Sequence, residues 1–295
     1  MLLSEKLEEY SKQGDTNKFK VTYNKLKDVI ENNIDKSKYK VNVYLQGSYV
    51  NDTNILGDSD VDIIVELENM FSHNINEHPE NVQKQFHAKF KDSDLSLYKF
   101  KNHVKDILDD TNHRYIEKSK CIKVTSGVPL SADLIICNKY RRYTNYPNKH
   151  EGIFFKDKYG YSIISFPKLH KENMTNKNLV MKNFKQTVRI FKNFKNELLD
   201  LNLIEESAIS SYHVESLLYN VPNKYFSSYD FEDRVNDILV YLVSNYDNFP
   251  GFITPCNQKY LFGNGNNQWK TNDALNFLIK IRSVFFEGKY AQIFG

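Results

Sequence analysis

Two aspartates alternate with apolar residues at the start of one short segment, and this feature constrains the fold more than any other. Residues 60–65 have the sequence Asp-Val-Asp-Ile-Ile-Val. In a β-strand, side chains two positions apart point to the same face, and the residue between them points to the other. The segment therefore predicts a strand that buries its alternate apolar row, Val61, Ile63 and Val65, and presents Asp60 and Asp62 together.

Carboxylates placed this way indicate a metal site. Two ionised carboxylates on one face repel each other unless a cation lies between them. Mg²⁺ suits a site built from oxygen ligands that also receives phosphate oxygens, because it keeps octahedral geometry and seldom relies on protein ligands alone. A solvated acidic loop is the alternative, and the apolar side of the same strand argues against it.

A Gly-Ser pair precedes this strand. Residues 41–45 alternate as a strand does, and Gly47 and Ser48 follow directly. A glycine backbone lets amide groups approach an anion closely, and the Ser48 hydroxyl can hydrogen-bond a phosphate oxygen. A lone Gly-Ser pair is more often an ordinary turn. Here a short polar loop, residues 51–57, joins it to the acidic strand, which favours a phosphate-binding role.

Residues 46–55, running into residues 57–62, resemble the signature of the polymerase-beta-like nucleotidyltransferase superfamily. Within it they are similar to the bacterial cGAS/DncV-like nucleotidyltransferases (CD-NTases), in particular to the CdnE-like group. The resemblance implies an α+β fold in which a nucleotidyltransferase core, a mixed sheet with flanking helices, packs against a C-terminal helical lobe. We expect the catalytic core over residues 1–175, and over residues 176–295 a helical lobe that closes the nucleotide cleft.

A third carboxylate is expected from a later strand. Asp133 interrupts the small and apolar segment 130–137, and a carboxylate there is costly to bury without a partner or a metal. The alternative is an Asp133 that pairs with a nearby lysine or arginine. With Asp60 and Asp62 binding two Mg²⁺ ions, or Mn²⁺ in their place, Asp133 would bind the ion at the attacking hydroxyl.

Composition narrows the classes of protein. A chain of 295 residues that is 40% hydrophobic and 14% aromatic is not a disordered protein. No apolar run reaches the roughly 18 residues of a membrane span, and the N-terminus lacks the apolar stretch of a signal peptide. We therefore expect a cytoplasmic protein without a membrane partner. The net charge of +3 does not require a nucleic-acid partner.

Residues 184–192 predict a helix with three cations on one face. Lys185, Arg189 and Lys192 follow each other at i, i+4 and i+7, a spacing that suits a triphosphate. An ordinary solvated basic face is the alternative. The resemblance to related nucleotidyltransferases assigns Lys192 to the donor triphosphate.

Three further residues are assigned to nucleotide binding by the same resemblance. Ser211 and Tyr212 begin a second helix and match a polar residue and an aromatic that contact the donor; a Tyr212 that faces the core is the alternative. Asn173 matches a residue that helps to read a nucleobase in CdnE-like enzymes. An amide can pair with a pyrimidine edge, which favours uridine, whereas Asn173 as a helix cap is the alternative.

Together with the resemblance, these features lead us to expect a template-independent enzyme that joins ribonucleoside triphosphates, such as ATP and UTP, and releases pyrophosphate. The resemblance implies that the product is a cyclic oligonucleotide, since nothing in the residues alone shows cyclisation. The resemblance implies that the product is a second messenger, a cyclic dinucleotide containing a pyrimidine, in CBASS-type anti-phage defence, and that it activates a separate effector protein. Two alternatives stay open. One is transfer of the nucleotide to an RNA end, a protein or a small molecule, and the other is a nucleotide-binding regulator without catalysis.

Overall fold

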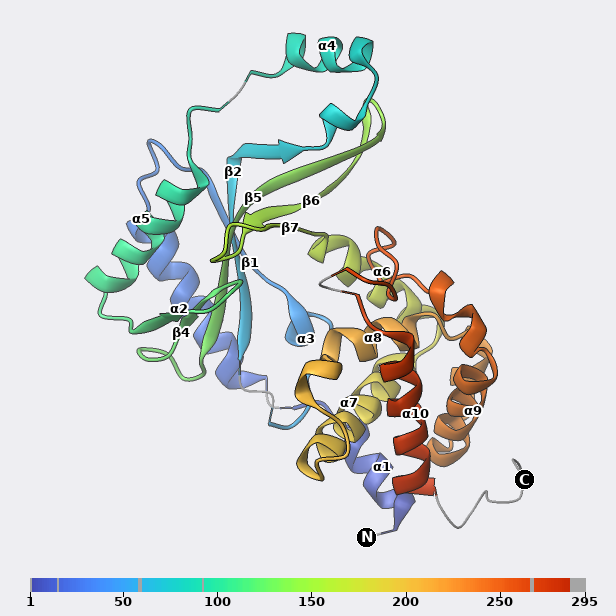
Figure 1. The fold of residues 1–295 in the computed structure, drawn as a ribbon. Coiled ribbons are helices and arrows are strands. Elements are labelled where there is room, and N and C mark those ends of the chain that lie inside the picture. The colour runs from blue at the N-terminus through green and yellow to red at the C-terminus, as the bar shows by residue number, and fades with distance from the viewer. Residues whose placement is uncertain (1, 15, 58–59, 92, 266–267, 287–295) are drawn as a thin grey trace. The chain divides into compact units, whose positions relative to one another are not determined.

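The computed structural model describes residues 2–14, 16–57, 60–91, 93–265 and 268–286 (Figure 1). Asp58 and Ser59 of the acidic motif lie outside these ranges. The chain divides into two compact units. The sheet unit comprises Asp15–Val50 and Ser59–Lys168, and the helical unit comprises Met1–Gly14, Asn51–Asp58 and Leu169–Gly295. Each unit is discontinuous in sequence, so this division differs from the expected single cut after residue 175.

One mixed sheet forms the centre of the sheet unit. Its strand order is β1-β2-β5-β4-β3, with β6 pairing with β5 and β7 pairing with β6. The β2–β5 pair is parallel, and the other pairs are antiparallel. The strands are β1 (Val41–Leu45), β2 (Val61–His73), β3 (Tyr115–Glu117), β4 (Ile122–Val124), β5 (Ala132–Asn145), β6 (Asn148–Lys156) and β7 (Ser162–Ser165).

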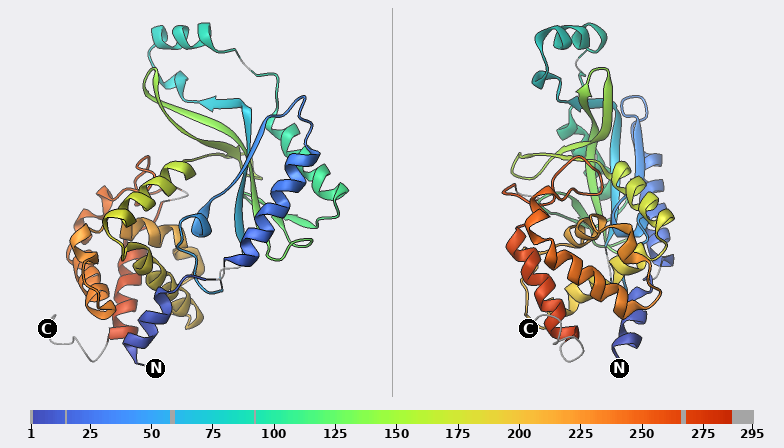
Figure 2. Two further views of the ribbon diagram at one scale, coloured as in Figure 1. Left: turned by 180° about the vertical axis from the view of Figure 1, so that it is seen from behind. Right: turned by 90° about the vertical axis from the view of Figure 1, so that its right-hand side faces the viewer.

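Helices α2 (Asn17–Asn33) and α5 (Leu97–Asp110) lie side by side over one face of this sheet (Figures 1 and 2). They bury a core that includes the alternate apolar row of β2: Val61, Ile63 and Val65. The predicted facing of that row is therefore confirmed. The short α3 (Gly47–Val50) follows β1, and α4 (Glu80–Lys89) packs Phe86 against Tyr143 near the far end of β5.

The helical unit packs its helices around a second core. These helices are α1 (Leu3–Ser11), α6 (Pro167–Val180), α7 (Phe184–Asp200), α8 (Ser211–Tyr219), α9 (Phe231–Ser244) and α10 (Thr271–Phe286), joined in part by the 3₁₀ turns η2 (Glu206–Ala208), η3 (Asn223–Phe226) and η4 (Tyr246–Gly251). A further 3₁₀ turn, η1 (Ile75–Glu77), precedes α4 in the sheet unit. Ten of the 17 residues of α7 are buried, Lys185, Arg189 and Lys192 among them. A helix of this kind is surrounded by neighbours rather than lying on a surface.

The architecture confirms the expected α+β class, a mixed sheet with flanking helices and a separate set of C-terminal helices. In the described part of the chain, no helix combines the length and the apolar character needed to cross a bilayer.

Candidate active site

Three aspartates emerge on one face of the sheet. Asp62 on β2 and Asp133 on β5 are directly in register on neighbouring parallel strands. Asp60 stands one residue before β2 and two before Asp62, so it continues the same row. The neighbours Val61 and Ile63 belong to the core under α2 and α5, which places the three carboxylates on the opposite face.

The Gly-Ser turn lies directly against this row. Gly47 begins α3 with a φ of +75°, and a Cβ atom on it would lie 2.2 Å from Asp62 Oδ2. Only glycine fits both the backbone conformation and the close approach. The Gln46 amide donates to the Asp62 carbonyl at 3.0 Å, and the Tyr49 ring stacks on Phe19 with centroids 4.4 Å apart. These contacts fix the turn that presents Ser48 and Asp62.

Asp60 is bound on both of its oxygens. Lys123 Nζ on β4 donates to Oδ2 at 2.5 Å, and the Ser131 hydroxyl donates to Oδ1. Burial alone would raise the pKa of Asp60, but these two hydrogen bonds and the Lys123 charge outweigh it and lower the pKa. Asp60 is therefore held as a carboxylate.

Asp133 has a different environment. Burial, together with the negative charge of Asp60, raises the pKa of Asp133. Its Oδ1 atom is buried and has no hydrogen-bond partner among the described residues. Burial also raises the pKa of the neighbouring Cys121 thiol to about 12, and Asp133 adds to the shift. An orphaned carboxylate oxygen in such a place requires a proton or a cation.

The donor set on this face fits a hard divalent cation, because it offers carboxylate oxygens in adjacent positions and one oxygen that lacks a partner. Within the described ranges, no three His, Cys, Asp or Glu side chains are drawn together tightly enough to form a metal-binding group. Asp60 instead faces Lys123, so metal binding would require the Asp60 side chain to exchange at least one partner.

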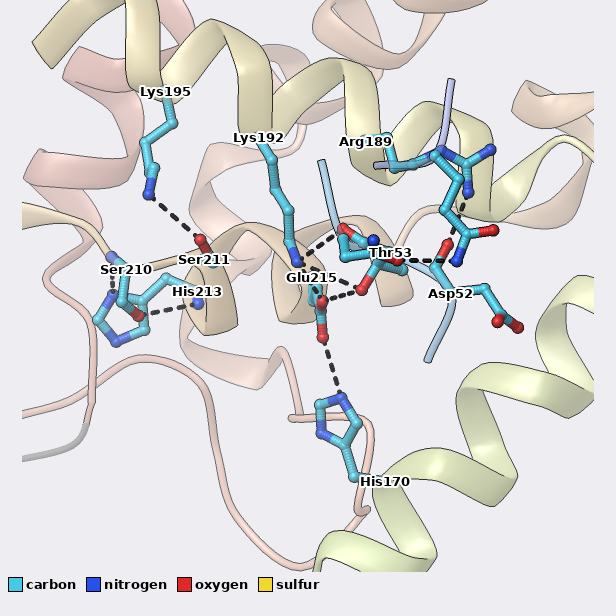
Figure 3. Close-up of polar contacts among 12 residues, drawn as sticks. Asp52, Thr53, His170, Arg189, Lys192, Lys195, Ser210, Ser211, His213 and Glu215 are labelled. Carbon is cyan, nitrogen blue, oxygen red and sulfur yellow. Dashed lines mark hydrogen bonds and ion pairs between the residues drawn. The ribbon is translucent and has the colours of Figure 1, made fainter. Parts of the chain in front are cut away.

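The helical unit holds the other predicted site residues, and its three-cation face has an unexpected role. We call residues 51–57, the polar loop of the motif, the connecting segment. Lys185 Nζ donates to Asp52 Oδ2 at 2.8 Å, and Arg189 donates to the Ser11 carbonyl at 2.6 Å. Arg189 also donates to the Asp52 carbonyl at 2.6 Å (Figure 3). Lys185 and Arg189 are each only 9% exposed.

Lys192 extends this pattern into a buried charge cluster. Its Nζ lies 2.7 Å from Glu215 Oε1 of α8 and donates to the Thr53 carbonyl at 3.0 Å (Figure 3). The Thr53 hydroxyl donates to the same Glu215 oxygen, and His170 Nε2 lies 3.2 Å from the other one. Lys192 is 1% exposed and Glu215 is 4% exposed.

The expectation that Arg189 and Lys192 reach a triphosphate stays a prediction, and in this structure both side chains contact protein backbone. Part of the connecting segment is buried, including Thr53 and Asn54, and buried carbonyl groups need donors. The cations of α7 supply them, and Glu215 balances the Lys192 charge. In the structure the cations of α7 therefore bind the connecting segment. A phosphate contact by Lys192 would break its buried ion pair with Glu215.

Lys195, one turn further along α7, is the lysine that meets Ser211. Its Nζ donates to Ser211 Oγ at 3.2 Å (Figure 3). Ser210 caps α8 by accepting from the His213 amide, which leaves the Ser211 hydroxyl available for Lys195. Tyr212 is 38% exposed and stacks on His170 with ring centroids 5.5 Å apart. The sequence analysis did not single out Lys195, because Lys192 already completed the i, i+4, i+7 spacing with Lys185 and Arg189.

The N-terminus of α8 thus combines three features that favour an anion. The helix dipole attracts negative charge at this end, and the Ser211 hydroxyl and the Lys195 ammonium lie beside it. Asn173, on α6, donates from Nδ2 to the Pro255 carbonyl at 2.7 Å. A primary amide retains a second hydrogen and an acceptor oxygen for a base edge.

The sheet unit carries three carboxylates beside a turn that begins with Gly47. The helical unit presents Ser211 and Lys195 at the N-terminus of α8. Together these features define a nucleotidyltransferase. Two family models agree with this. Residues 26–157 match the nucleotidyltransferase domain, and residues 172–285 match the cGAS/DncV-like nucleotidyltransferase C-terminal helical domain.

Two relatives align with almost the whole chain. The cyclic nucleotide synthase CdnE01 of Staphylococcus haemolyticus is 36% identical over 96% of this chain and 98% of its own length. The cyclic UMP-AMP synthase of Rhodothermus marinus is 33% identical over 92% of this chain and 93% of its own. The chain therefore belongs to the cGAS/DncV-like nucleotidyltransferases, and within them it is CdnE-like.

Solved structures support the same placement. The structure of Rhodothermus marinus CdnE c-UMP-AMP synthase with Apcpp and Upnpp superposes with a TM-score of 0.86 at 31% identity, covering 96% of both chains. The structure of Elizabethkingia meningoseptica CdnE cyclic dinucleotide synthase with GTP and Apcpp gives a TM-score of 0.79 at 26% identity, covering 95% of this chain and 97% of that one.

Proposed function

We propose that this protein joins ribonucleoside triphosphates into a cyclic dinucleotide and releases pyrophosphate at each of two transfers. The observation that carries the proposal is the carboxylate face: Asp62 and Asp133 in register, Asp60 two residues earlier, and Gly47 in contact with Asp62. Relatives that match more than nine-tenths of the chain are a cyclic nucleotide synthase and a cyclic UMP-AMP synthase.

Each transfer forms a bond from an acceptor hydroxyl oxygen to the α-phosphorus of a donor triphosphate, and breaks the bond that releases pyrophosphate. The Gly47 backbone and the Ser48 hydroxyl bind phosphate oxygens. Asp133, whose pKa is raised by burial, is placed to accept the proton of the acceptor hydroxyl. Two Mg²⁺ ions held by Asp60, Asp62 and Asp133 would supply charge compensation and a lowered pKa for that hydroxyl.

In the helical unit, Ser211 and Lys195 bind the donor triphosphate at the N-terminus of α8, and Tyr212 offers an aromatic face to the donor base. Lys195 takes the role that the sequence suggested for Lys192, since the latter is buried against Glu215. Asn173 pairs with a pyrimidine edge and favours uridine in the product. The cyclic product acts as a second messenger on a separate effector protein in CBASS-type anti-phage defence.

The test is to incubate the purified protein with four labelled ribonucleoside triphosphates and either Mg²⁺ or Mn²⁺, to treat the mixture with phosphatase, and to analyse the survivors by mass spectrometry. A phosphatase-resistant dinucleotide without a terminal phosphate is expected, and it should disappear in Asp62→Asn with the circular dichroism spectrum unchanged. Intact triphosphates, or linear products alone, would contradict cyclisation. Product from Asp62→Asn at the wild-type rate would contradict the assigned site.

A further inference from the structure

A lysine shares the face of the sheet that carries the three aspartates. Lys123 on β4 is in register with Asp133 on β5, which is itself in register with Asp62 on β2. The neighbours of Lys123 on its own strand, Ile122 and Val124, are fully buried in the core under α2 and α5. Because side chains alternate along a strand, this packing directs Lys123 onto the carboxylate face.

The lysine is bound to the metal motif itself. Lys123 Nζ lies 2.5 Å from Asp60 Oδ2, and the two side chains are only 25% and 34% exposed. Ser131 occupies the other Asp60 oxygen, whereas Asp133 Oδ1 has no partner. The carboxylate face therefore carries a lysine as well as three acidic side chains, and this lysine is bound to Asp60.

A second ion pair in the sheet unit offers a comparison for the Lys123–Asp60 pair. Lys105 on α5 pairs with Glu117 on β3, and its side chain is 21% exposed, close to the value for Lys123. Neither Lys105 nor Glu117 belongs to the carboxylate row. Lys123 is thus comparable with Lys105 in burial and pairing, but it differs because its partner is a candidate metal ligand.

The geometry points to Lys123 as a resident counter-ion that holds Asp60 and weakens the binding of free divalent cations, so that the site loads with the cation that arrives on a nucleoside triphosphate. This inference rests on the proposed function. An ammonium on one ligand repels a second cation at the same ligand. A triphosphate offers phosphate oxygens in exchange, which allows Lys123 to leave Asp60 without losing an ionic partner.

The test measures Mn²⁺ binding to the full chain without nucleotide, from the electron paramagnetic resonance signal of free Mn²⁺ during a titration. Lys123→Met should bind Mn²⁺ at least about tenfold more tightly than the wild type, because one opposing charge has been removed. Lys105→Met, the matched control, should bind as the wild type does. Lys123→Arg keeps the charge and should also bind as the wild type does. Lys123→Gln repeats the test with a polar side chain if Lys123→Met does not fold.

The outcomes separate this inference from the metal site on which it rests. Repeating each titration in the Asp62→Asn background defines the binding that belongs to the site. If Asp62-dependent binding is equal in the wild type and in Lys123→Met, or is weaker in the variant, the role of Lys123 is overturned while the site stands. If Mn²⁺ binds with equal affinity in the presence and absence of the Asp62 carboxylate, the proposed metal site itself is overturned.

Discussion

The substitution Glu215→Gln tests whether the buried cations of α7 stabilise the fold of the helical unit. It removes the charge of a residue that is 4% exposed and leaves the Lys192 ammonium, 1% exposed, with uncharged acceptors on Thr53 and on the new amide group. Removing one partner of a buried ion pair costs about 3–5 kcal/mol, because the remaining charge is left uncompensated in the interior. We expect the free energy of unfolding of the helical unit to fall by that amount.

Urea denaturation followed by tryptophan fluorescence measures this effect in the right place. Trp269 is the single tryptophan of the chain, is 1% exposed and belongs to the core of the helical unit. The control is Glu9→Gln in the same unit, since Glu9 lies 3.8 Å from Lys12 and both side chains are more than half exposed. An exposed pair of this kind contributes about 0–1 kcal/mol. Equal losses in the two variants would refute the argument.

A double-mutant cycle makes the test sharper. Lys192→Met alone leaves a buried carboxylate, whereas Lys192→Met combined with Glu215→Gln leaves neither charge, so the double variant should be more stable than the sum of the two losses predicts. Strict additivity would show that the two charges do not depend on each other, and would contradict the 2.7 Å contact.

The stability difference should also depend on pH. Burial would raise the pKa of Glu215, but the Lys192 charge and the His170 contact outweigh it and hold the pKa well below the usual range. A carboxyl group with a lowered pKa in the folded state stabilises that state above its unfolded pKa, about 4.3, and loses this contribution as the pH falls. The gap between the wild type and Glu215→Gln should therefore narrow below about pH 4, and a gap that widens there would contradict the assignment.

Three further predictions concern catalysis. Gly47→Ala adds a Cβ that would lie 2.2 Å from Asp62 Oδ2 at a φ of +75°, and it should lower kcat about 100-fold in a pyrophosphate-release assay. Lys195→Ala should raise the KM for triphosphates by about tenfold or more, as expected for a charged hydrogen bond, and Ser211→Ala should do so to a smaller extent; an unchanged KM would remove both from the donor site. Asn173→Ser should change the bases found in the product by mass spectrometry, and an unaltered product would exclude Asn173 from base selection.

Most of the sheet unit follows from alternation in the sequence. The apolar row of β2 predicted which face of the strand meets the core. The register that sets Asp62 beside Asp133 could not be obtained in this way, because it is fixed by pairing between strands about seventy residues apart. Lys123 was missed for the same reason, since its relation to Asp60 exists only after β4 pairs with β5.

The helical unit shows where spacing alone is insufficient. Lys185, Arg189 and Lys192 keep the i, i+4, i+7 spacing of a phosphate-binding face, yet all three are buried. The sequence does contain a signal for this. Ile190 and Phe194 widen the apolar face that Phe184, Val188, Phe191 and Leu198 form on α7, which leaves less of the helix for a solvated face. Glu215, an acid within an apolar stretch of α8, is a second signal, because a buried acid needs a buried cation.

The contacts between the cations of α7 and the connecting segment explain why this segment is polar. The segment joins the Gly47 turn to the Asp60 strand, and its polar groups would be costly to bury without partners. Arg189 and Lys192 bind its carbonyls at Asp52 and Thr53. The fully buried Asn54 accepts from the Gly14 amide with its carbonyl and donates from Nδ2 to the Gly14 carbonyl, both at 3.2 Å. The polar groups of the connecting segment therefore bind the helices of the helical unit. The residues proposed for catalysis, Gly47 and Ser48 before the segment and Asp60 and Asp62 after it, lie outside it.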